Sequence, residues 1–388
     1  MLSCVIGYIR GSIIKNIVII NPFRSNIGGA FKHSIALVHA VLASGSATKV
    51  TVFTCKSNIP YFEKLTKRYK NLNICVYSLD NKYFRWILAK FSYFPGINKK
   101  LLNKISAINP DILFFTAPWI DAIHVKAQRK ICVIHDLFNF MHSNRTNYMI
   151  LEKERGRRTI ECINYSDEVI VESEVTKSQI LLLYKEFKLA KKNISIVGMP
   201  PGFINLSILG EADLQFQGIN DYWLAPSHIT PFKNQLLIVQ SLALLRKQGI
   251  QTKVMFTFPT FNFQYLFKLI YTAAKGGVLK NLKWRYQASD DEMVKYYQSC
   301  IGVIMPSKIG PTNMPIEEAI EFNKVCLASE QASAAYQAGP NVLKFGSEDV
   351  HELARLMSKT RCIEEPAESP SKLFFKAIND LLARQPNG

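Results

Sequence analysis

The chain has 388 residues, of which 48% are hydrophobic and 20% are charged, a composition that excludes an intrinsically disordered protein. Its length exceeds one ordinary hydrophobic core, so two domains of roughly 200 and 180 residues are expected. The net charge of +18 is unevenly distributed, because residues 1–210 hold 29 Lys/Arg and 13 Asp/Glu whereas residues 211–388 hold 19 and 17. This basic N-terminal half predicts a polyanionic partner, either nucleic acid or the anionic face of a membrane.

No run of about 18 consecutive apolar residues occurs, so a membrane-spanning helix is not expected. The eight cysteines are scattered and form no Cys-x-x-Cys pair, which predicts buried thiols in a reducing compartment. Residues 1–14 are apolar, but no basic stretch precedes them and they continue directly into a strand. They are interpreted as an extension or a misplaced start, and not as a signal peptide. These features predict a cytoplasmic protein.

Short runs rich in Val, Ile and Phe recur along the chain, and each is followed by a segment with helical spacing. The first series lies at 16–20, 49–55, 73–79, 111–118, 131–136, 168–173 and 194–200, and the second at 221–226, 253–259, 282–287, 302–307, 325–329 and 341–345. Strands that are apolar on both faces and alternate with helices predict parallel sheets covered on both sides.

The two series are separated by residues 200–218, a Pro/Gly-containing stretch without a clear strand or helix signal. We therefore predict an α/β protein with two Rossmann-like domains, one at 1–203 and one at 204–369. A C-terminal helix at about 370–388 is the candidate to pack back on the first domain. Ligands of such sheets bind beyond the carboxyl ends of the strands, so the site is expected in the cleft between the domains.

The first strand-to-helix junction contains Gly28 and Gly29. Paired glycines allow the backbone to approach a sugar or phosphate at the positive end of a helix, although a plain tight turn explains them equally well. The third glycine of a dinucleotide fingerprint is missing, which argues against NAD.

A histidine and an aspartate, His135 and Asp136, follow the fifth apolar strand. At this position a histidine can donate a hydrogen bond to a sugar hydroxyl or exchange a proton near neutral pH. The alternative is a strand-end histidine that is simply bonded to a loop carbonyl.

The first junction of the second domain contains His228 and Lys233 ahead of an amphipathic helix. A lysine at a helix N-terminus opposes the helix dipole, and this placement is favourable when an anion lies between the two. His228 would add a donor to the same anion. A solvated surface lysine is the other interpretation.

The turn after the strand at 302–307 reads Gly310, Pro311, Thr312, Asn313, Met314 and leads into a helix expected near Pro315 or Ile316. Proline at the first helical position and the acidic residues Glu317 and Glu318 are ordinary helix-start features. They do not explain the preceding turn, whose backbone N–H groups we expect to face a ligand.

Taken in order, the Gly-Gly loop, the His-Asp pair, SDEVIVESEVTKSQI, IVGMPPG, PFKNQ, YYQSCIGVIMPS and GPTNMPIEEA resemble the retaining glycosyltransferases of family 4, which have the GT-B fold. The resemblance extends from about Asn16 to about Leu356. It implies that Lys233 binds the donor diphosphate, that Glu318 holds the donor ribose, and that His135 lies beside the transferred sugar. The residues from Gly310 to Met314 would offer N–H groups to the donor, and Gly28 and Gly29 would lie near the diphosphate and the acceptor.

Two departures from that family concern the donor site. The first glutamate of its Glu-x7-Glu motif is replaced by Gly310, in a Gly-Pro-Thr-Asn variant that also occurs in the family, and the usual Gly-Arg before the lysine is replaced by Ser227-His228. Loss of the arginine removes a bidentate phosphate donor, which puts the strength of phosphate binding in question.

The resemblance predicts transfer of a sugar, with retention, from a nucleotide diphosphate sugar to a hydroxyl of a glycan or lipid-linked acceptor in bacterial surface polysaccharide or lipopolysaccharide synthesis. No Asp-x-Asp occurs, so no metal and no cofactor are expected, and His228, Lys233 and the helix N-terminus would stabilise the leaving diphosphate. A GT-B-fold sugar-nucleotide epimerase and a non-catalytic nucleotide-sugar-binding protein are the alternatives.

Residues 82–105 mix basic and aromatic side chains at helical spacing, a pattern suited to docking on the inner face of the cytoplasmic membrane. Nucleic acid would fit the same composition, but no fold-level motif supports it. Ordinary packing of one apolar helix face beneath solvated lysines explains the pattern equally well.

Overall fold

The structure is a computed structural model that describes residues 14–23, 28–76, 99–118, 125–135, 137, 149–187, 189, 192–202, 221–310, 312–335, 341–359 and 368–384. Several predictions fall on other residues. The extension at 1–13, most of the segment 82–105, Asp136, Pro311 and the linker around 203–220 lie outside the described part of the chain.

Within the described residues, the N-terminal domain is a seven-stranded parallel sheet with the order β3-β2-β1-β4-β5-β6-β7. Its strands are β1 (Ile14–Ile20), β2 (Ala47–Thr54), β3 (Leu72–Val76), β4 (Ile112–Phe115), β5 (Arg129–Ile134), β6 (Glu168–Val171) and β7 (Asn193–Ile196). Its helices are α1 (Gly28–Ala43), α2 (Ile59–Arg68), α4 (Lys99–Ile108), α6 (Met149–Tyr165) and α7 (Glu174–Phe187), with the short 3-10 turn η1 (Lys56–Asn58).

The C-terminal domain is a second parallel sheet, six-stranded in the described residues, with the order β10-β9-β8-β11-β12-β13. Its strands are β8 (Trp223–Pro226), β9 (Val254–Phe258), β10 (Leu282–Tyr286), β11 (Gly302–Met305), β12 (Val325–Ser329) and β13 (Val342–Phe345). Its helices are α9 (Gln235–Lys247), α10 (Phe263–Lys275), α11 (Asp290–Ser299), α12 (Met314–Glu321) and α13 (Val350–Lys359), with the 3-10 turns η4 (Pro231–Lys233) and η5 (Leu279–Asn281).

Each sheet is apolar on both faces because successive strand residues enter different cores. In β1, Ile17 and Ile19 belong to one buried cluster and Val18 and Ile20 to another on the opposite face. The second sheet has the same two-sided burial. The thirteen predicted strands and the two Rossmann-like domains are therefore confirmed, with ends that differ from the expected ones by up to four residues.

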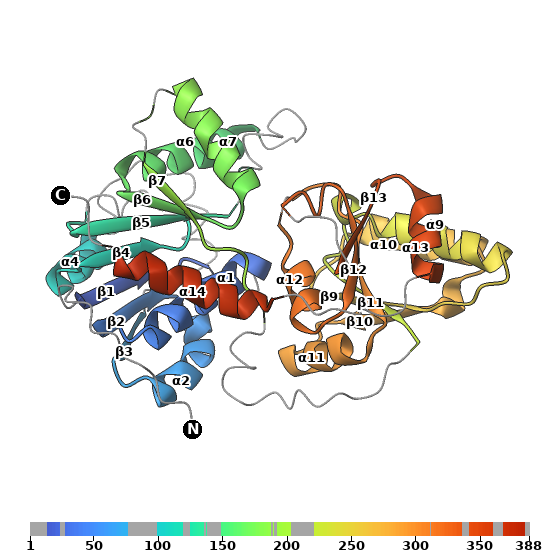
Figure 1. Ribbon diagram of the computed structural model, residues 1–388, viewed down its shortest axis with the longest axis horizontal. Coiled ribbons are helices and arrows are strands. Elements are labelled where there is room, and N and C mark those ends of the chain that lie inside the picture. The colour runs from blue at the N-terminus through green and yellow to red at the C-terminus, as the bar shows by residue number, and fades with distance from the viewer. Residues whose placement is uncertain are drawn as a thin grey trace.

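The last helix, α14 (Pro370–Ala383), lies against α1 of the N-terminal domain (Figure 1). Phe374, Ile378 and Leu381 are buried in the core that α1 shares with the first sheet. The buried Arg129 pairs with Glu168 and also donates to the carbonyl oxygen of Leu381 at 3.0 Å. This network fixes the end of the chain to the first sheet.

The carboxyl ends of β1 and β4 in the first sheet, and of β8 and β11 in the second, mark the points where strand order reverses. Ligands of open α/β sheets bind at such points. Among the described residues, no helix is long and apolar enough to cross a bilayer. The described cysteines are unpaired thiols, and all but the half-buried Cys75 are buried.

Candidate functional site

The two domains meet along the carboxyl ends of their strands, with α12 between the sheets (Figure 1). Polar contacts cross this boundary at separate places. Thr312 Oγ1 donates to Glu172 Oε2 at 2.8 Å, the backbone N–H of Gly202 donates to Glu318 Oε1 at 3.0 Å, and Lys32 Nζ pairs with Asp290 Oδ1 at 2.7 Å. The boundary between the domains, where the sequence predicts the cleft, thus contains charged and hydroxyl side chains from both domains.

Lys233 lies at the end of η4, immediately before α9. Its Nζ donates to Asn313 Oδ1 at 3.2 Å, and burial lowers the pKa of this lysine from 10.5 to about 8. Within the part of the chain that the structure describes, no carboxylate lies within 4.0 Å of Nζ. A desolvated ammonium group of this kind is well placed to bind an anion.

His228 lies near Lys233 and near the glycine loop of the other domain. Its Nδ1 is 2.5 Å from Thr260 Oγ1, and its Nε2 lies 3.7 Å from the place that a Cβ on Gly28 would occupy. Burial, with a further contribution from Lys233, lowers the pKa of His228, so the neutral imidazole is favoured. His228 is therefore suited to donate one hydrogen bond to an anion rather than to add a second positive charge.

The turn before α12 is braced by the side chain of Asn313. Its Nδ2 donates to the carbonyl oxygens of Gly310 at 3.0 Å and of Ala332 at 2.9 Å, while its Oδ1 accepts from Lys233. Gly310 has a φ of +95°, a conformation that side-chain-bearing residues rarely adopt. The helix begins at Met314, one residue before the predicted start. Asn313 therefore holds the turn through its side chain.

Glu318 is 6% exposed and lies one turn into α12. Its Oε2 accepts from the hydroxyl of Tyr297, and its Oε1 accepts from Gly202 N. Burial raises the pKa of Glu318, although the nearby Lys32 acts in the opposite direction. Burial alone would lower the pKa of Lys32, but the carboxylates of Asp290 and Glu318 outweigh it and raise that pKa. The charges of Lys32, Asp290 and Glu318 therefore depend on one another.

Gly202 comes close to these charges. A Cβ at this position would lie 2.5 Å from Glu318 Oε1 and 2.7 Å from both Lys32 Cδ and Met314 Sδ, so these side chains would have to shift to admit it. On the neighbouring glycine loop, a Cβ on Gly29 would reach Met314 Cε at 3.7 Å. Two segments of the N-terminal domain thus approach the start of α12 closely.

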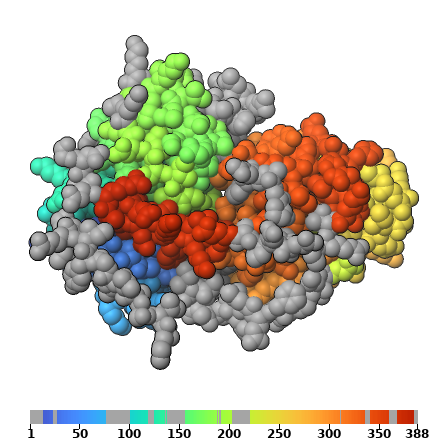
Figure 2. Space-filling view, in the orientation of Figure 1, coloured from blue at the N-terminus to red at the C-terminus, as the bar shows by residue number. Residues whose placement is uncertain are grey.

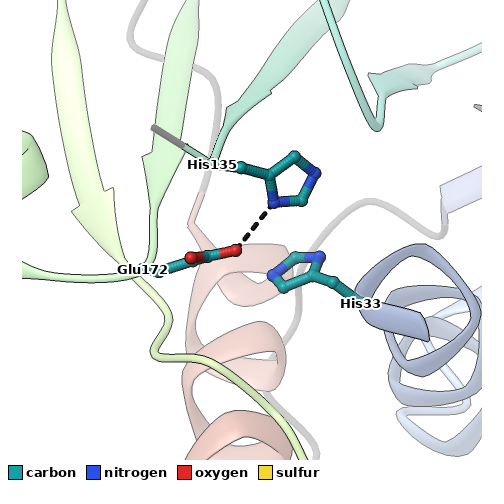
Figure 3. A group of neighbouring side chains, drawn as sticks. All are labelled: His33, His135 and Glu172. Atoms are coloured by element: carbon teal, nitrogen blue, oxygen red, sulfur yellow. Dashed lines mark hydrogen bonds and ion pairs between the residues drawn. The ribbon is translucent and has the colours of Figure 1, made fainter. Parts of the chain in front are cut away.

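His135 follows β5 and faces Glu172, which follows β6, and His33 of α1 (Figure 3). Its Nδ1 lies 2.7 Å from Glu172 Oε1, and its Nε2 lies 3.0 Å from the carbonyl oxygen of Thr116. The ring centroids of His33 and His135 are 4.9 Å apart. Burial and the neighbouring His135 lower the pKa of His33 well below its usual value of 6.5. The carbonyl bond expected for a strand-end histidine is present, together with a bond to the carboxylate of Glu172, which the sequence analysis did not single out.

The predicted site residues form three groups along the boundary between the domains. Lys233 and Asn313 are in direct contact, Gly28 approaches His228, and Gly29 approaches Met314. Among the described residues, His135 is linked to the turn before α12 through Glu172 and Thr312. Pro311 lies outside the described residues.

Sequence reasoning missed five residues of the cleft: His33, Lys32, Glu172, Asp290 and Tyr297. For Glu172 a signal existed, because a carboxylate follows directly after four buried strand residues. His33 lies in the helix that follows the Gly-Gly pair. Asp290 and Tyr297 belong to α11, whose sequence shows only an ordinary capped helix.

No model of a known protein family matches the chain, and no curated protein matches it either. Solved structures do resemble it. The Anabaena protein HepE in complex with UDP-glucose aligns with a TM-score of 0.63 and 16% identity, over 95% of this chain and 98% of that one. Sucrose-phosphate synthase of Thermosynechococcus elongatus aligns with a TM-score of 0.60 and 14% identity, over 95% of each chain. WaaG, a glycosyltransferase involved in lipopolysaccharide biosynthesis, aligns with a TM-score of 0.59 and 13% identity, over 95% of each chain. At these identities the similarity establishes the GT-B fold and nothing finer.

Proposed function

We propose that this protein is a glycosyltransferase that moves a sugar from a nucleotide diphosphate sugar to a hydroxyl group of an acceptor. The observation that carries the proposal is Lys233, a desolvated cation at the carboxyl edge of β8 that has no described carboxylate partner. A diphosphate at this place would be bound by Lys233, by His228 and by the N-terminus of α12. The GT-B fold, shared with proteins that bind UDP and UDP-glucose, supports the same assignment.

In this proposal Glu318 holds the ribose. Its two oxygens already accept from Tyr297 and Gly202, and each has remaining lone pairs for a sugar hydroxyl. Gly310, Pro311, Thr312, Asn313 and Met314 would line the donor phosphates and sugar. His135 would lie beside the transferred sugar, where Glu172 fixes its ring orientation. Glu318 acts as a binder here and not as a base.

We propose that the reaction proceeds with retention, with the acceptor attacking the face of the sugar from which the diphosphate departs. The bond from the anomeric carbon to the diphosphate oxygen breaks, the bond to the acceptor oxygen forms, and the acceptor proton passes to the departing phosphate. Lys233, His228 and the N-terminus of α12 stabilise the charge that develops on this leaving group. We propose that the diphosphate needs no metal ion.

The acceptor that we propose is a glycan or lipid-linked glycan of a bacterial surface polysaccharide or lipopolysaccharide. WaaG supports this class by its fold similarity, and the basic N-terminal half supports an acceptor at an anionic surface. The cytoplasmic face of the membrane is the corresponding location.

A GT-B-fold sugar-nucleotide epimerase is the second candidate, because the cleft contains two buried carboxylates from opposite domains. Glu172 is 4% exposed and Glu318 is 6% exposed. Acid–base chemistry on a bound sugar requires such groups within reach of the ring. An epimerase would convert the nucleotide sugar without any acceptor, which distinguishes the two functions.

The test is a thermal-shift screen of nucleoside diphosphates and their sugars, followed by product analysis. A ligand that binds only the folded state stabilises it by about 2.7 kcal/mol at 100 times its Kd. We expect a raised Tm with one nucleoside diphosphate, and release of that nucleotide from its sugar only when a glycan acceptor is present. A new nucleotide sugar formed without acceptor would identify the epimerase, and no Tm response to any member would refute both functions.

A further inference from the structure

His33, His135 and Glu172 form a compact cluster of metal-binding side chains from three elements (Figure 3). One ligand atom of each lies within 4.8 Å of the others. His33 is fully buried, and neither of its ring nitrogens has a hydrogen-bond partner among the described residues. A buried imidazole without a partner is costly in a protein interior, because both nitrogens have lost their hydrogen bonds to water.

The surroundings of this cluster match the outer shell of a metal site. Ligating histidines usually donate their second ring N–H to a carbonyl or carboxylate, and ligating carboxylates are themselves hydrogen-bonded. His135 Nε2 faces the carbonyl oxygen of Thr116 at 3.0 Å, which leaves Nδ1 for a metal. Glu172 Oε2 accepts from Thr312 Oγ1 at 2.8 Å, which leaves Oε1 for a metal.

The geometry of the cluster leaves a place for a cation among the three side chains. His135 Nδ1 and Glu172 Oε1 lie 2.7 Å apart, and the ring of His33 lies next to them, with its centroid 4.9 Å from that of His135. A divalent cation at that position would bind both groups and supply His33 with a partner.

We propose that His33, His135 and Glu172 bind one divalent transition-metal ion, of which Zn²⁺ is the representative. Two histidines and one carboxylate are a donor set that Zn²⁺ accepts, with bonds of about 2.0–2.2 Å. Ligand atoms on a tetrahedral ion lie about 3.4 Å apart, so the cluster adjusts by about 1 Å on binding. The side chain of His135 is 15% exposed, so solvent can supply the fourth ligand.

This site lies on the N-terminal side of the cleft and is separate from Lys233, which the proposed function assigns to the diphosphate. Its Thr312 contact belongs to the turn that leads into α12. The ion would therefore fix the orientation of His135 and support the contact between the two domains. The inference does not depend on glycosyl transfer.

The test is metal binding by purified full-length protein that has been freed of metal with a chelator. Zn²⁺ titrated in competition with a chromophoric chelator should bind at one ion per chain. His33→Phe and Glu172→Gln should each weaken the affinity by about 100-fold, and Thr312→Val, which removes an outer-shell bond, by about 10-fold. His39→Phe is the matched control, because His39 is also buried in α1 but bonds to Tyr69 away from the cluster. The Zn²⁺ affinity of this variant should equal that of wild type.

Co²⁺ substitution identifies the ligands independently of affinity. The expected visible spectrum is that of a site with nitrogen and oxygen donors, and it should disappear in both ligand variants. Circular dichroism establishes that each variant is folded. Three results would each overturn the proposal. The first is failure of wild type to retain Zn²⁺, and the second is binding of Zn²⁺ by His33→Phe and Glu172→Gln as tightly as by wild type. The third is a thiolate-to-cobalt charge-transfer band, which would assign the ion to cysteines.

A different observation concerns the outer surface of the C-terminal domain. Phe263, Phe267 and Tyr271 of α10 are 76%, 66% and 63% exposed and lie at intervals of four residues, so they share one helix face. Ile270, 39% exposed, lies beside them. The helix is at the end of the molecule farthest from the N-terminal domain (Figure 2). An apolar face of this kind marks a contact surface.

The chain around α10 is strongly basic. Residues 222–289 contain nine Lys/Arg and no Asp or Glu, and this stretch includes all of β8, α9, β9, α10 and β10. Lys268 and Lys275 of α10 itself are exposed. Exposed aromatic side chains next to the exposed lysines of the same helix complement an anionic bilayer, in which the rings enter the headgroup region and the lysines meet the phosphates.

We propose that the exposed face of α10 docks on an anionic membrane. The test is flotation of the protein with phosphatidylcholine vesicles that contain or lack phosphatidylglycerol. Binding should require phosphatidylglycerol, fall in high salt, and decrease about 10-fold in the double variant Phe263→Ser, Phe267→Ser. Leu182→Ser, which changes a 64% exposed apolar residue of α7, is the control and should bind like wild type.

Two results would overturn the membrane proposal. Unchanged binding by the double variant would place the contact elsewhere, for example on the basic N-terminal domain. A wild-type dimer in solution that the double variant converts to a monomer, without any vesicle binding, would identify the face as an interface between two copies of the chain.

Discussion

Replacement of Lys233 by methionine should stabilise the protein without ligand while removing its response to a nucleoside diphosphate. Burial lowers the pKa of Lys233 from 10.5 to about 8, and at about 1.4 kcal/mol per tenfold change this difference corresponds to about 3 kcal/mol. Solvent at the edge of the cleft screens part of this cost, and loss of the bond to Asn313 removes about 1 kcal/mol. We therefore expect Lys233→Met to be about 1 kcal/mol more stable than wild type at pH 7.

The pH dependence follows from the same pKa. Between pH 8 and 10.5 the unfolded chain keeps a proton that the folded chain has lost, so the free energy of unfolding of wild type rises with pH in this window. This rise should be absent in Lys233→Met. Diphosphate affinity should have the opposite dependence, since a bound anion favours the ammonium form. It should be constant below about pH 8 and fall above it.

Urea denaturation at pH 7 and pH 9.5 measures the stability, and the Tm shift with nucleoside diphosphate measures binding. Lys247→Met is the control, because Lys247 is an exposed lysine at the far end of α9. It should change stability by less than about 0.5 kcal/mol and keep the ligand response. If Lys233→Met lowers the free energy of unfolding by more than about 2 kcal/mol and its Tm still rises with nucleoside diphosphate, Lys233 is a structural residue. The proposed anion site is then wrong.

Three further substitutions examine the surroundings of Glu318 and the domain contact. Gly202→Ala should cost about 1–3 kcal/mol in urea denaturation and weaken donor binding, because its Cβ would meet Glu318 Oε1 at 2.5 Å. Tyr297→Phe, which removes the hydroxyl bonded to the buried Glu318 carboxylate, should lower stability by about 1.5–3 kcal/mol, and an unchanged urea midpoint would contradict that bond. Thr312→Val should cost about 1 kcal/mol and raise KM for the donor more than it lowers kcat, which steady-state kinetics would measure.

The fold was predictable because its signal is local. A strand covered on both faces is apolar at every position, and runs such as those of β1 and β6 show this without knowledge of their neighbours. The positions of Lys233 and Glu318 followed from strand-to-helix junctions, which parallel sheets bring to one edge. Strand ends were less predictable, because the residues that follow β4 and β11 remain apolar or small after the hydrogen-bonded ladder has ended.

The partners of the site residues were not predictable, because each contact joins segments far apart in the sequence. Glu172 and Thr312 are separated by 140 residues, and Lys32 and Asp290 by 258. Only the packing of one domain on the other brings them together. The bond from Gly202 to Glu318 is the extreme case, since its donor is a backbone N–H that has no sequence signal. A sequence can therefore indicate where a cleft lies before it indicates which charges are coupled across it.

The resemblance noted in the sequence expects a glutamate at the position of Gly310. At φ +95° a glutamate would be strained, so a glutamate here would require another backbone conformation of the turn. The observed conformation is maintained by Asn313, which bonds to the carbonyl oxygen of Gly310 and to Lys233. A carboxylate is nevertheless present on the other side of the turn, because Thr312 reaches Glu172 of the N-terminal domain. These contacts depend on one another, because each leaves a polar group without its partner when the other group is removed. The proposed function therefore treats Gly310, Thr312, Asn313 and Glu172 as one connected variant of the donor site.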